Sequence, residues 1–515
     1  MSNVLDEVID GFEPLPELVS VMAASKAAIL LSLDIGTSGI RAAVFDGSAE
    51  EIEGASVRIN SRVAGISDYA IIDADLLLEQ VARTLDALFA KLNEPITHIE
   101  LIAISCFWHS LLGVDETGQP TSPVLGWSDS RAAEAASQLR SELDEAKFHV
   151  RTGCRFHPSY WPAKLLRLQN VEPEVFRATD RWLSFADYLT LKFFGETATS
   201  VSMASGTGLL NQRTCEWDEE LLKALHIGVE HLPEIAGPNR TFNGLTRSYA
   251  LRWPQLDDAR LFPAIGDGAA NNIGAGCHST EKVALMIGTS GAMRVLFEGE
   301  PPDPLASELW CYRADRSRIL VGGALSDGGG LYNWIKEWLL YGEDAEYIEG
   351  ELELLHPNAH GLTILPFWAG ERSTGWTPAA SGAILGLNLQ TRPVEILRAA
   401  MEAVAYRFSL IARALKPLAP GATIVASGHA LRSSPTWVQI LADVLGSRVM
   451  ASRLPEASMR GAALLALEAA GKIHSIEEFA VSVERIFEPD MSRHAVYQEG
   501  IEQQQRIYKK LFAEN

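Results

Sequence analysis

The five residues Ile-Gly-Thr-Ser-Gly occur twice, at 35–39 and at 287–291, about half the chain apart. Strand-forming apolar residues flank both copies, so each copy is predicted to be the turn between two strands. Glycines permit a tight turn with exposed N–H groups, and the Thr and Ser hydroxyls add donors, which suits phosphate oxygens. Two ordinary hairpins that share a turn are the alternative. A literal repeat in matching strand contexts favours two homologous domains that hold one nucleotide.

The length and the charge of the chain restrict its partners. With 515 residues the chain has room for at least two domains, since single domains usually comprise about 100 to 200 residues. The formal net charge of −22 argues against nucleic acid and against an anionic membrane as the main partner, because both reward clustered Lys and Arg. Small molecules bound in a cleft between domains are the expected partners.

The cysteines and the N-terminus indicate a reducing compartment. Five cysteines without any Cys-x-x-Cys pair suggest neither a disulfide framework nor a zinc site. No apolar run reaches the roughly 18 to 20 residues of a membrane span, and residues 1–26 are acidic where a signal peptide would be basic. We expect a cytoplasmic protein with an acidic extension over residues 1–27. The sequence does not fix the oligomeric state and is compatible with a homodimer.

Strand and helix patterns alternate along the chain, which predicts an α/β fold with central sheets. The apolar spacing of 75–92 is typical of an amphipathic helix, and a strand is expected at 99–104. Further helices are expected at 132–143, 180–194, 331–340 and 393–415. Near the C-terminus we expect a strand at 423–426, a turn at 427–430, and a helix that begins at Ser434 and Pro435.

A domain boundary is expected at 277–282, just before the second copy of the repeat. It gives an N-terminal domain at 28–278 and a C-terminal domain at 279–515. No low-complexity linker separates the two, so we expect a broad contact and a hinge around the cleft.

Asp34 directly precedes the first turn, so its carboxylate should lie beside any phosphate held there. Mg²⁺ prefers one or two carboxylates together with water and phosphate oxygens. A carboxylate that caps its own turn is the alternative. Met286 takes the equivalent place in the second copy, so the turn itself does not require an acid, and the metal role is favoured.

Asp267 is the only ionisable residue within 264–276, a segment rich in glycine and alanine. Small neighbours allow a substrate to come close, and a lone carboxylate could accept the proton of an attacking hydroxyl. Asp267 is also a good N-cap for a following helix. The sequence does not separate these two roles.

The motifs resemble those of the FGGY carbohydrate kinase family, part of the superfamily of actin, sugar kinases and Hsp70. The resemblance runs in register from Leu31 to about Leu467. It is carried by the segments 34–41, 127–131, 266–268, 287–291, 370–373 and 427–443. It implies two domains of the actin-like, ribonuclease H-like type with an interdomain cleft, and ATP-dependent phosphorylation of a sugar or polyol hydroxyl.

The resemblance also implies roles for individual residues. Asp267 would be the general base, and Asp34 would organise Mg²⁺. Phosphates would be met by Gly36, Thr37, Ser38 and Arg41 from one domain and by Gly288, Thr289 and Ser290 from the other. The adenosine would lie against Gly428, His429 and Ala430, in a turn where Ser427 and His429 replace the usual glycines.

Within the family, the segments 152–158, 266–272, 287–294 and 322–329 look most like the gluconokinase branch. Gluconate carries a carboxylate, with which Arg155, His157, Lys164 or Arg131 could pair. Structural ion pairs of Arg131 and Lys164 are an equally weighted alternative.

Trp108 and His109 are expected to meet the sugar. An aromatic plane suits the C–H face of a polyol, and a polar donor beside it suits the hydroxyls. A buried, satisfied histidine is the alternative. His109 matches the position at which many family members use a histidine on the sugar.

Other functions remain in view. A kinase for a ketose or polyol (xylulose, ribulose, glycerol, erythritol) would use the same scaffold, although Gly268 stands where pentulose kinases tend to carry an amide. An actin-like or Hsp70-like nucleotide-switch ATPase would lack the segments around Trp127 and Gly370. Intact Asp34 and Asp267 speak against a non-catalytic sugar sensor.

Overall fold

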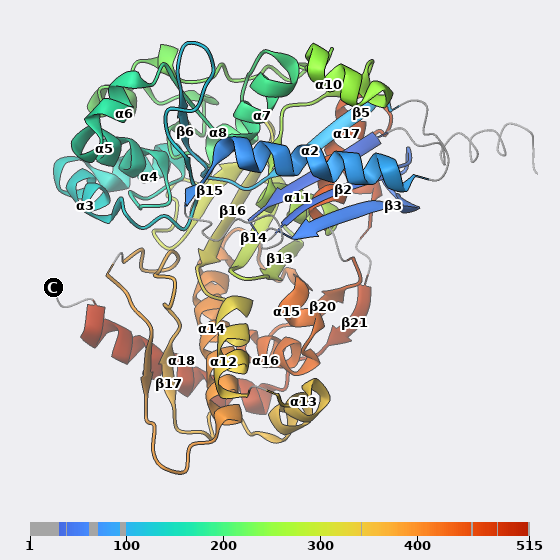
Figure 1. Cartoon of the computed structure of the whole chain (residues 1–515). Helices are drawn as coiled ribbons and strands as arrows, with labels where there is room; N and C mark the ends of the chain where they lie inside the picture. Colours follow the sequence, from blue (N-terminus) through green and yellow to red (C-terminus); the bar gives the residue numbers. More distant parts are fainter. Residues whose placement is uncertain are drawn as a thin grey trace, which may run out of the picture.

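The computed structural model describes residues 30–37, 39–60, 71–92, 99–340, 342–377, 379–454, 457–480 and 483–512. Two bodies, each built around a mixed sheet, lie one above the other (Figure 1). The α/β prediction is confirmed. The acidic extension predicted for residues 1–27 lies outside the described residues. No helix in the described ranges is long and apolar enough to cross a membrane.

The first body is built on a sheet of order β11-β5-β1-β2-β3, with β12 paired to β5. Its central strand β1 is almost entirely buried, runs parallel to β5 and runs antiparallel to β2. The strands are β1 (Leu30–Gly36), β2 (Gly39–Phe45), β3 (Glu51–Asn60), β5 (Leu101–Cys106), β11 (Arg260–Leu261) and β12 (Ile265–Gly266).

The second body is built on a sheet of order β15-β16-β14-β13-β19-β20-β21. Here β13 runs antiparallel to β14 and parallel to β19. The strands are β13 (Lys282–Ile287), β14 (Gly291–Glu298), β15 (Trp310–Arg313), β16 (Arg318–Leu325), β19 (Thr423–Ser427), β20 (Val449–Ser452) and β21 (Val483–Phe487).

The two sheets repeat one topology, as the duplicated pentapeptide predicts. The order β5-β1-β2-β3 in the first sheet corresponds to β19-β13-β14-β16 in the second. The two copies of the pentapeptide nevertheless fold differently. Gly36 pairs with Gly39 in the first hairpin, whereas Ile287 pairs with Gly291 in the second, so the second turn is one residue longer.

Most predicted helices are present within a few residues of their expected bounds. They are α2 (Ala74–Lys91), α3 (Ala133–Glu142), α12 (Gly329–Leu339), α14 (Pro393–Leu415) and α16 (Pro435–Leu445), which the Ser434 side chain caps. The helix expected at 180–194 begins only at Phe185 as α7 (Phe185–Phe194), because Arg181–Leu183 forms strand β8 and the Ser184 hydroxyl caps the helix.

Smaller helices extend the first body at one end of its sheet (Figure 1). They surround an apolar core of their own, which contains Trp161, Trp182 and Trp217. The helices are α4 (Glu145–Thr152), α5 (Trp161–Val171), α6 (Pro173–Ala178), α8 (Val201–Ser205) and α9 (Glu219–Ala224).

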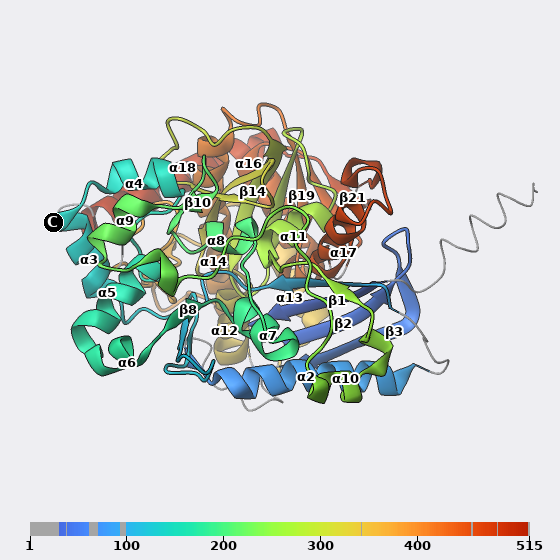
Figure 2. The ribbon, with the colours of Figure 1, turned by 90° about the horizontal axis from the view of Figure 1, so that it is seen from above.

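Helix α17 (Ala457–Ala469) joins the two bodies. It falls within the predicted C-terminal domain, but its apolar residues, such as Met459 and Leu464, lie in the core of the first body. Figure 2 shows α2 on one face of the first sheet and α17 with α11 (Asp267–Gly274) on the other. The C-terminal part of the chain therefore completes the layer that carries Asp267.

Helices α11 and α17 cross with almost no space between their backbones. A Cβ atom on Gly274 would lie 1.8 Å from the carbonyl oxygen of Ala457, and one on Gly461 would lie 1.8 Å from that of Ala270. Only glycine allows this approach, because real Cβ contacts are never so short.

We expect Gly461→Ala to lower the free energy of unfolding by about 2 kcal/mol or more, since the added methyl group must force α11 and α17 apart. Thermal unfolding measures the effect. Gly350→Ala is the matched control: Gly350 is an exposed residue of α13 (Ala345–Leu354) with open space around it, and alanine there should stabilise the helix by about 0.5 to 1 kcal/mol. Equal unfolding temperatures for Gly461→Ala and the unchanged protein would contradict the tight crossing.

Candidate active site

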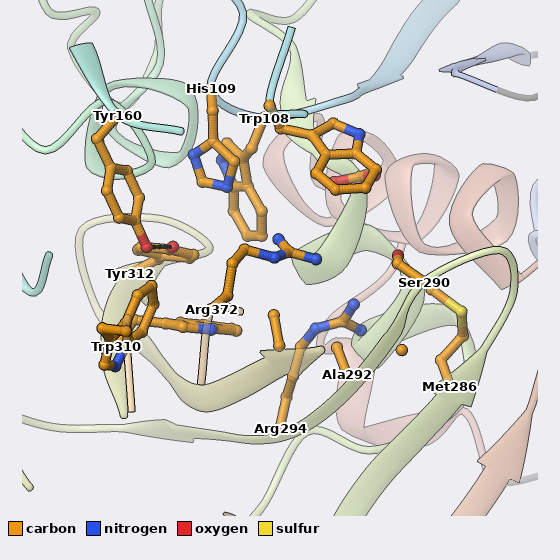
Figure 3. A pocket seen from close by; sticks show the side chains of 15 residues that line it. Trp108, His109, Tyr160, Met286, Ser290, Ala292, Arg294, Trp310, Tyr312 and Arg372 are labelled. Carbon is orange, nitrogen blue, oxygen red and sulfur yellow. Dashed lines mark hydrogen bonds between the residues drawn. The ribbon is translucent and has the colours of Figure 1, made fainter. Parts of the chain in front are cut away.

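A pocket opens between the two bodies around Asp267 (Figure 3). The first body contributes Trp108, His109, Trp127, Tyr160 and Asp267 to its wall. The second body contributes Met286, Ser290, Gly291, Ala292, Arg294, Trp310, Tyr312, Ala324, Arg372 and Trp376. The interdomain cleft is therefore present, and its wall is mostly aromatic and cationic.

Asp267 is the first residue of α11, and Gly266 takes the N-cap position that the sequence analysis considered for Asp267. The carboxylate is enclosed by protein except where it lines the pocket, and its Oδ1 accepts a hydrogen bond from the N–H of Gly268 at 2.8 Å. Burial raises the pKa of Asp267 to about 6, the nearby Arg294 opposes this shift, and Asp34 adds to it. Such a value suits a general base near neutral pH.

The glycines around Asp267 make room for Trp108. A Cβ atom on Gly266 would lie 1.8 Å from Cε2 of Trp108, and one on Gly268 would lie 2.7 Å from its Cζ3. The indole N–H donates to the carbonyl of Ser202 at 2.9 Å. The ring is thereby fixed beside the carboxylate, as the predicted contact of Trp108 with a sugar requires.

Asp34 lies two residues before the end of β1 and is 4% exposed. Its Oδ1 accepts a hydrogen bond from the Ser105 hydroxyl at 2.9 Å, and its Oδ2 pairs with the Arg41 guanidinium at 2.6 Å. Arg41, predicted to meet a phosphate, is thus engaged with Asp34. Gly36 ends the strand, Thr37 follows it, and Ser38 lies outside the described residues.

The second turn is supported from behind by two glycine-rich segments. The carbonyls of Gly288 and Thr289 accept hydrogen bonds from the N–H groups of residues 328–330 at the start of α12. Gly428, with a φ of 105°, leaves room for the carbonyl of Ile287, which would lie 2.3 Å from a Cβ atom there. Ala430 lies close to Gly329, which supports this turn, and His429 begins the short helix α15 (His429–Arg432) directly after Gly428. Most of the residues predicted to bind nucleotide on this side therefore lie together, and Ser290 reaches the pocket.

His109 is held in an unusual conformation at the pocket. Its backbone φ is 69°, and its Nδ1 lies 2.5 Å from the carbonyl oxygen of Gly206. Burial lowers the pKa of His109 to about 3, so the ring is neutral and Nδ1–H is the donor to this carbonyl. Nε2 is then an acceptor, able to receive a hydrogen bond from a hydroxyl group.

Lys164 fixes His109 from below. Its Nζ is buried and donates to the carbonyl of His109 at 2.7 Å and to that of Leu125 at 3.1 Å. Burial lowers the pKa of Lys164 to about 7, which the nearby Asp129 opposes. Lys164 does not line the pocket, and its two hydrogen bonds are to backbone carbonyls behind it.

The other groups predicted to meet a carboxylate also have protein partners, and burial lowers the pKa of His157 to about 3, so that its ring is neutral. Arg155 pairs with Glu145 at 2.5 Å, and Arg131 pairs with Asp129 at 2.7 Å. The ring of His157 lies between the Ser159 hydroxyl and the carbonyl of Glu371. None of the three lines the pocket.

Arg294 and Arg372, to which the sequence analysis gave no role, lie in the pocket instead. Arg372 is oriented by the residue before it, because Glu371 forms a fully buried ion pair with Arg407 of α14. The Arg372 guanidinium crosses the cleft to the face of Trp127, 4.7 Å from the ring centroid. In the sequence, only the motif at 370–373 indicated that Arg372 could belong to the site. Arg294 was marked only by its place after the second turn.

Comparison with known proteins agrees with this geometry. Residues 29–274 match the N-terminal domain of the FGGY family of carbohydrate kinases, and residues 283–470 match its C-terminal domain. The chain belongs to this family. It is therefore an ATP-dependent carbohydrate kinase, with ATP as phosphate donor and an alcohol group as acceptor.

Relatives with different acceptors are about equally similar in sequence. The gluconokinase of Bacillus subtilis is 26% identical over 470 residues, which cover 87% of this chain and 89% of that protein. The xylulose kinase of Escherichia coli is 26% identical over 491 residues, which cover 93% and 99%. The crystal structure of gluconate kinase from Lactobacillus acidophilus superposes with a TM-score of 0.83 and 25% identity, covering 94% of this chain and 98% of that one.

Lys164 could either hold His109 in place or pair directly with a carboxylate of the substrate. If Lys164 only fixes His109, Lys164→Met should raise KM for charged and neutral acceptors alike, by about 5- to 30-fold, since a buried charge-assisted hydrogen bond is lost. Steady-state kinetics with gluconate, xylulose and ATP measure this. Lys147→Met, at an exposed ion pair with Glu220, is the control. An increase confined to gluconate would show that Lys164 pairs with the carboxylate directly.

Proposed function

We propose that this kinase phosphorylates a hydroxyl group of a sugar acid, and that gluconate is its acceptor. The charge of the pocket wall supports this choice. Two guanidinium groups, of Arg294 and Arg372, line the pocket against the single carboxylate of Asp267. An acceptor that carries its own carboxylate offsets the excess positive charge, whereas a neutral ketose leaves it uncompensated.

Asp267 is proposed to accept the proton of the acceptor hydroxyl as that oxygen attacks the γ-phosphorus of ATP. The new bond joins the acceptor oxygen to phosphorus, the bond from phosphorus to ADP breaks, and the proton passes to the carboxylate. Positioning and charge stabilisation carry most of the rate in such transfers. The aromatic wall of Trp108, Trp310 and Tyr312 excludes water from the acceptor.

The nucleotide is proposed to lie between the two turns. From the first body, the phosphates are bound by Gly36, Thr37 and Arg41. From the second body, they are bound by Gly288, Thr289 and Ser290. Ser38, which lies outside the described residues, is proposed from the sequence to bind a phosphate as well. The adenosine is proposed to lie along Gly428, His429 and Ala430, where the backbone turns tightly behind the second phosphate turn.

Mg²⁺ is proposed to be held by Asp34. The site fits a magnesium ion, because the Asp34 carboxylate supplies hard oxygen ligands beside the first turn, close enough to Asp267 to raise its pKa. Mg²⁺ commonly takes one or two carboxylates and fills its other positions with phosphate and water. When bound, it would neutralise charge on the phosphates, while Ser105 and Arg41 orient the carboxylate.

Asp267→Asn should lower kcat by about 10² to 10⁴, since the amide cannot accept the proton. The affinity for ATP, measured by calorimetry, should stay within about twofold of that of the unchanged enzyme, because the Asp267 side chain is not among the residues proposed to bind the nucleotide. A near-normal kcat would remove Asp267 from the mechanism.

The raised pKa of Asp267 predicts the pH dependence. The base must be ionised to work, so kcat/KM for the acceptor should fall about tenfold per pH unit below a midpoint near pH 6. A profile measured from pH 5 to 8 tests this. A flat profile across that range would contradict the assignment.

The acceptor itself is tested by measuring ADP release over gluconate, xylulose, ribulose, glycerol and erythritol. Gluconate should give the highest kcat/KM. Xylulose is the second candidate, because a xylulose kinase matches the chain at the same identity as gluconokinase. A preference for xylulose would overturn the proposed acceptor while leaving the family unchanged.

A further inference from the structure

We infer that Arg294 is the specificity-determining residue of this kinase, and that it binds the carboxylate of the acceptor from a space that glycine at position 268 leaves open. The inference rests on the proposed function and names the residue pair that selects a charged acceptor. It moves this role away from Arg155, His157 and Lys164, which have protein partners outside the pocket.

The first observation is that Arg294 is buried without a partner. It is 6% exposed, and within the described ranges its guanidinium forms no ion pair and no hydrogen bond, while Nη1 is shielded from solvent. The other buried arginines in the described ranges each have a protein partner for the guanidinium: Arg398 pairs with Glu402, Arg407 with Glu371, and Arg313 donates to two backbone carbonyls. An unpaired buried charge costs several kcal/mol. Such a group is retained for a ligand.

The second observation is the position of the guanidinium over Gly268. A Cβ atom at 268 would lie 3.2 Å from both Cζ and Nε of Arg294, and 2.7 Å from Cζ3 of Trp108. A side chain at 268 and the guanidinium of Arg294 therefore compete for one space. A larger residue at 268, on helix α11 of the first body, would therefore have to shift the guanidinium of Arg294, on strand β14 of the second body, and the ring of Trp108.

The third observation is the charge around this group. Asp267 attracts Arg294, although no ion pair joins the two in the described ranges, and Arg372 repels it. Figure 3 shows both guanidinium groups directed into the same space, below Trp108 and His109. An anion between them removes the repulsion and satisfies the free N–H groups, and a carboxylate matches the geometry of a guanidinium fork.

The transferred phosphoryl group is the other anion that Arg294 could bind. Two acceptor ligands that differ in charge distinguish binding of the carboxylate from binding of the phosphoryl group. Gluconate and its neutral alcohol, glucitol, have the same carbon chain. Their dissociation constants are measured by calorimetry without ATP, so that no turnover contributes. The proteins compared are the unchanged kinase, Arg294→Gln, and the control Arg316→Gln, which alters an exposed arginine of the same body.

The unchanged kinase should bind gluconate at least about tenfold more tightly than glucitol. Arg294→Gln should weaken gluconate binding by about 10- to 100-fold and leave glucitol within about twofold, and Arg316→Gln should change neither. The melting temperature of Arg294→Gln should be equal or higher, since an unpaired buried charge is removed. Equal losses for both ligands, or unchanged gluconate binding, would overturn the inference. A fall in kcat with intact gluconate binding would assign Arg294 to the phosphoryl group instead, which also overturns it.

The reciprocal exchange provides a second test. Gly268→Asn with Arg294→Ala places an amide where the guanidinium lies, and it should shift kcat/KM from gluconate towards a neutral ketose such as xylulose. An unchanged preference would contradict the exchange. The proposed acceptor and the role of Arg294 can fail separately. If the unchanged enzyme phosphorylates another acid sugar, gluconate is wrong as the acceptor. The role of Arg294 is still supported if Arg294→Gln loses the preference for that acid over its alcohol.

Discussion

The close packing of helix α11 is the constraint on which the site depends. Three positions of this short helix and its N-cap lack side chains: Gly266 and Gly268 lie against Trp108, and Gly274 lies against the backbone of α17. The first residue of the helix, Asp267, is thereby held at a fixed position between the two bodies. Because α17 comes from the far end of the chain, the Asp267 carboxylate is positioned only when the whole fold has formed.

Two charged groups of the site lie in surroundings that disfavour their charge. Arg294 is buried without a protein partner, and burial raises the pKa of Asp267 to about 6. Each arrangement lowers stability locally and is held in place by well-packed surroundings, such as the buried pair of Glu371 and Arg407 behind Arg372. Groups that are unsatisfied in the free enzyme are those an anionic acceptor and its phosphoryl donor would satisfy. The same logic explains why the paired cations Arg155 and Lys164 make poorer candidates.

The sequence predicted what is encoded locally. The repeated pentapeptide predicted two equivalent hairpins, and capping residues predicted the start of α16 at Pro435. It did not predict the one-residue difference between the turns, because identical turns are supported by different neighbours, such as residues 328–330 behind the second. It also missed Arg294, Arg372 and, of the aromatic wall, Trp310 and Tyr312, whereas Trp108 was predicted. These residues are far apart in the chain and meet only across the cleft, so no spacing or period in the sequence marks them.

The most direct test of this account is a crystal structure of the kinase with gluconate and a non-hydrolysable ATP analogue. We predict that the acceptor hydroxyl lies within about 3 Å of Asp267, that the carboxylate lies on the guanidinium of Arg294, and that the triphosphate lies between the turns at 36–39 and 288–290. Gluconate bound with its carboxylate away from both Arg294 and Arg372, or with no hydroxyl near Asp267, would contradict the account.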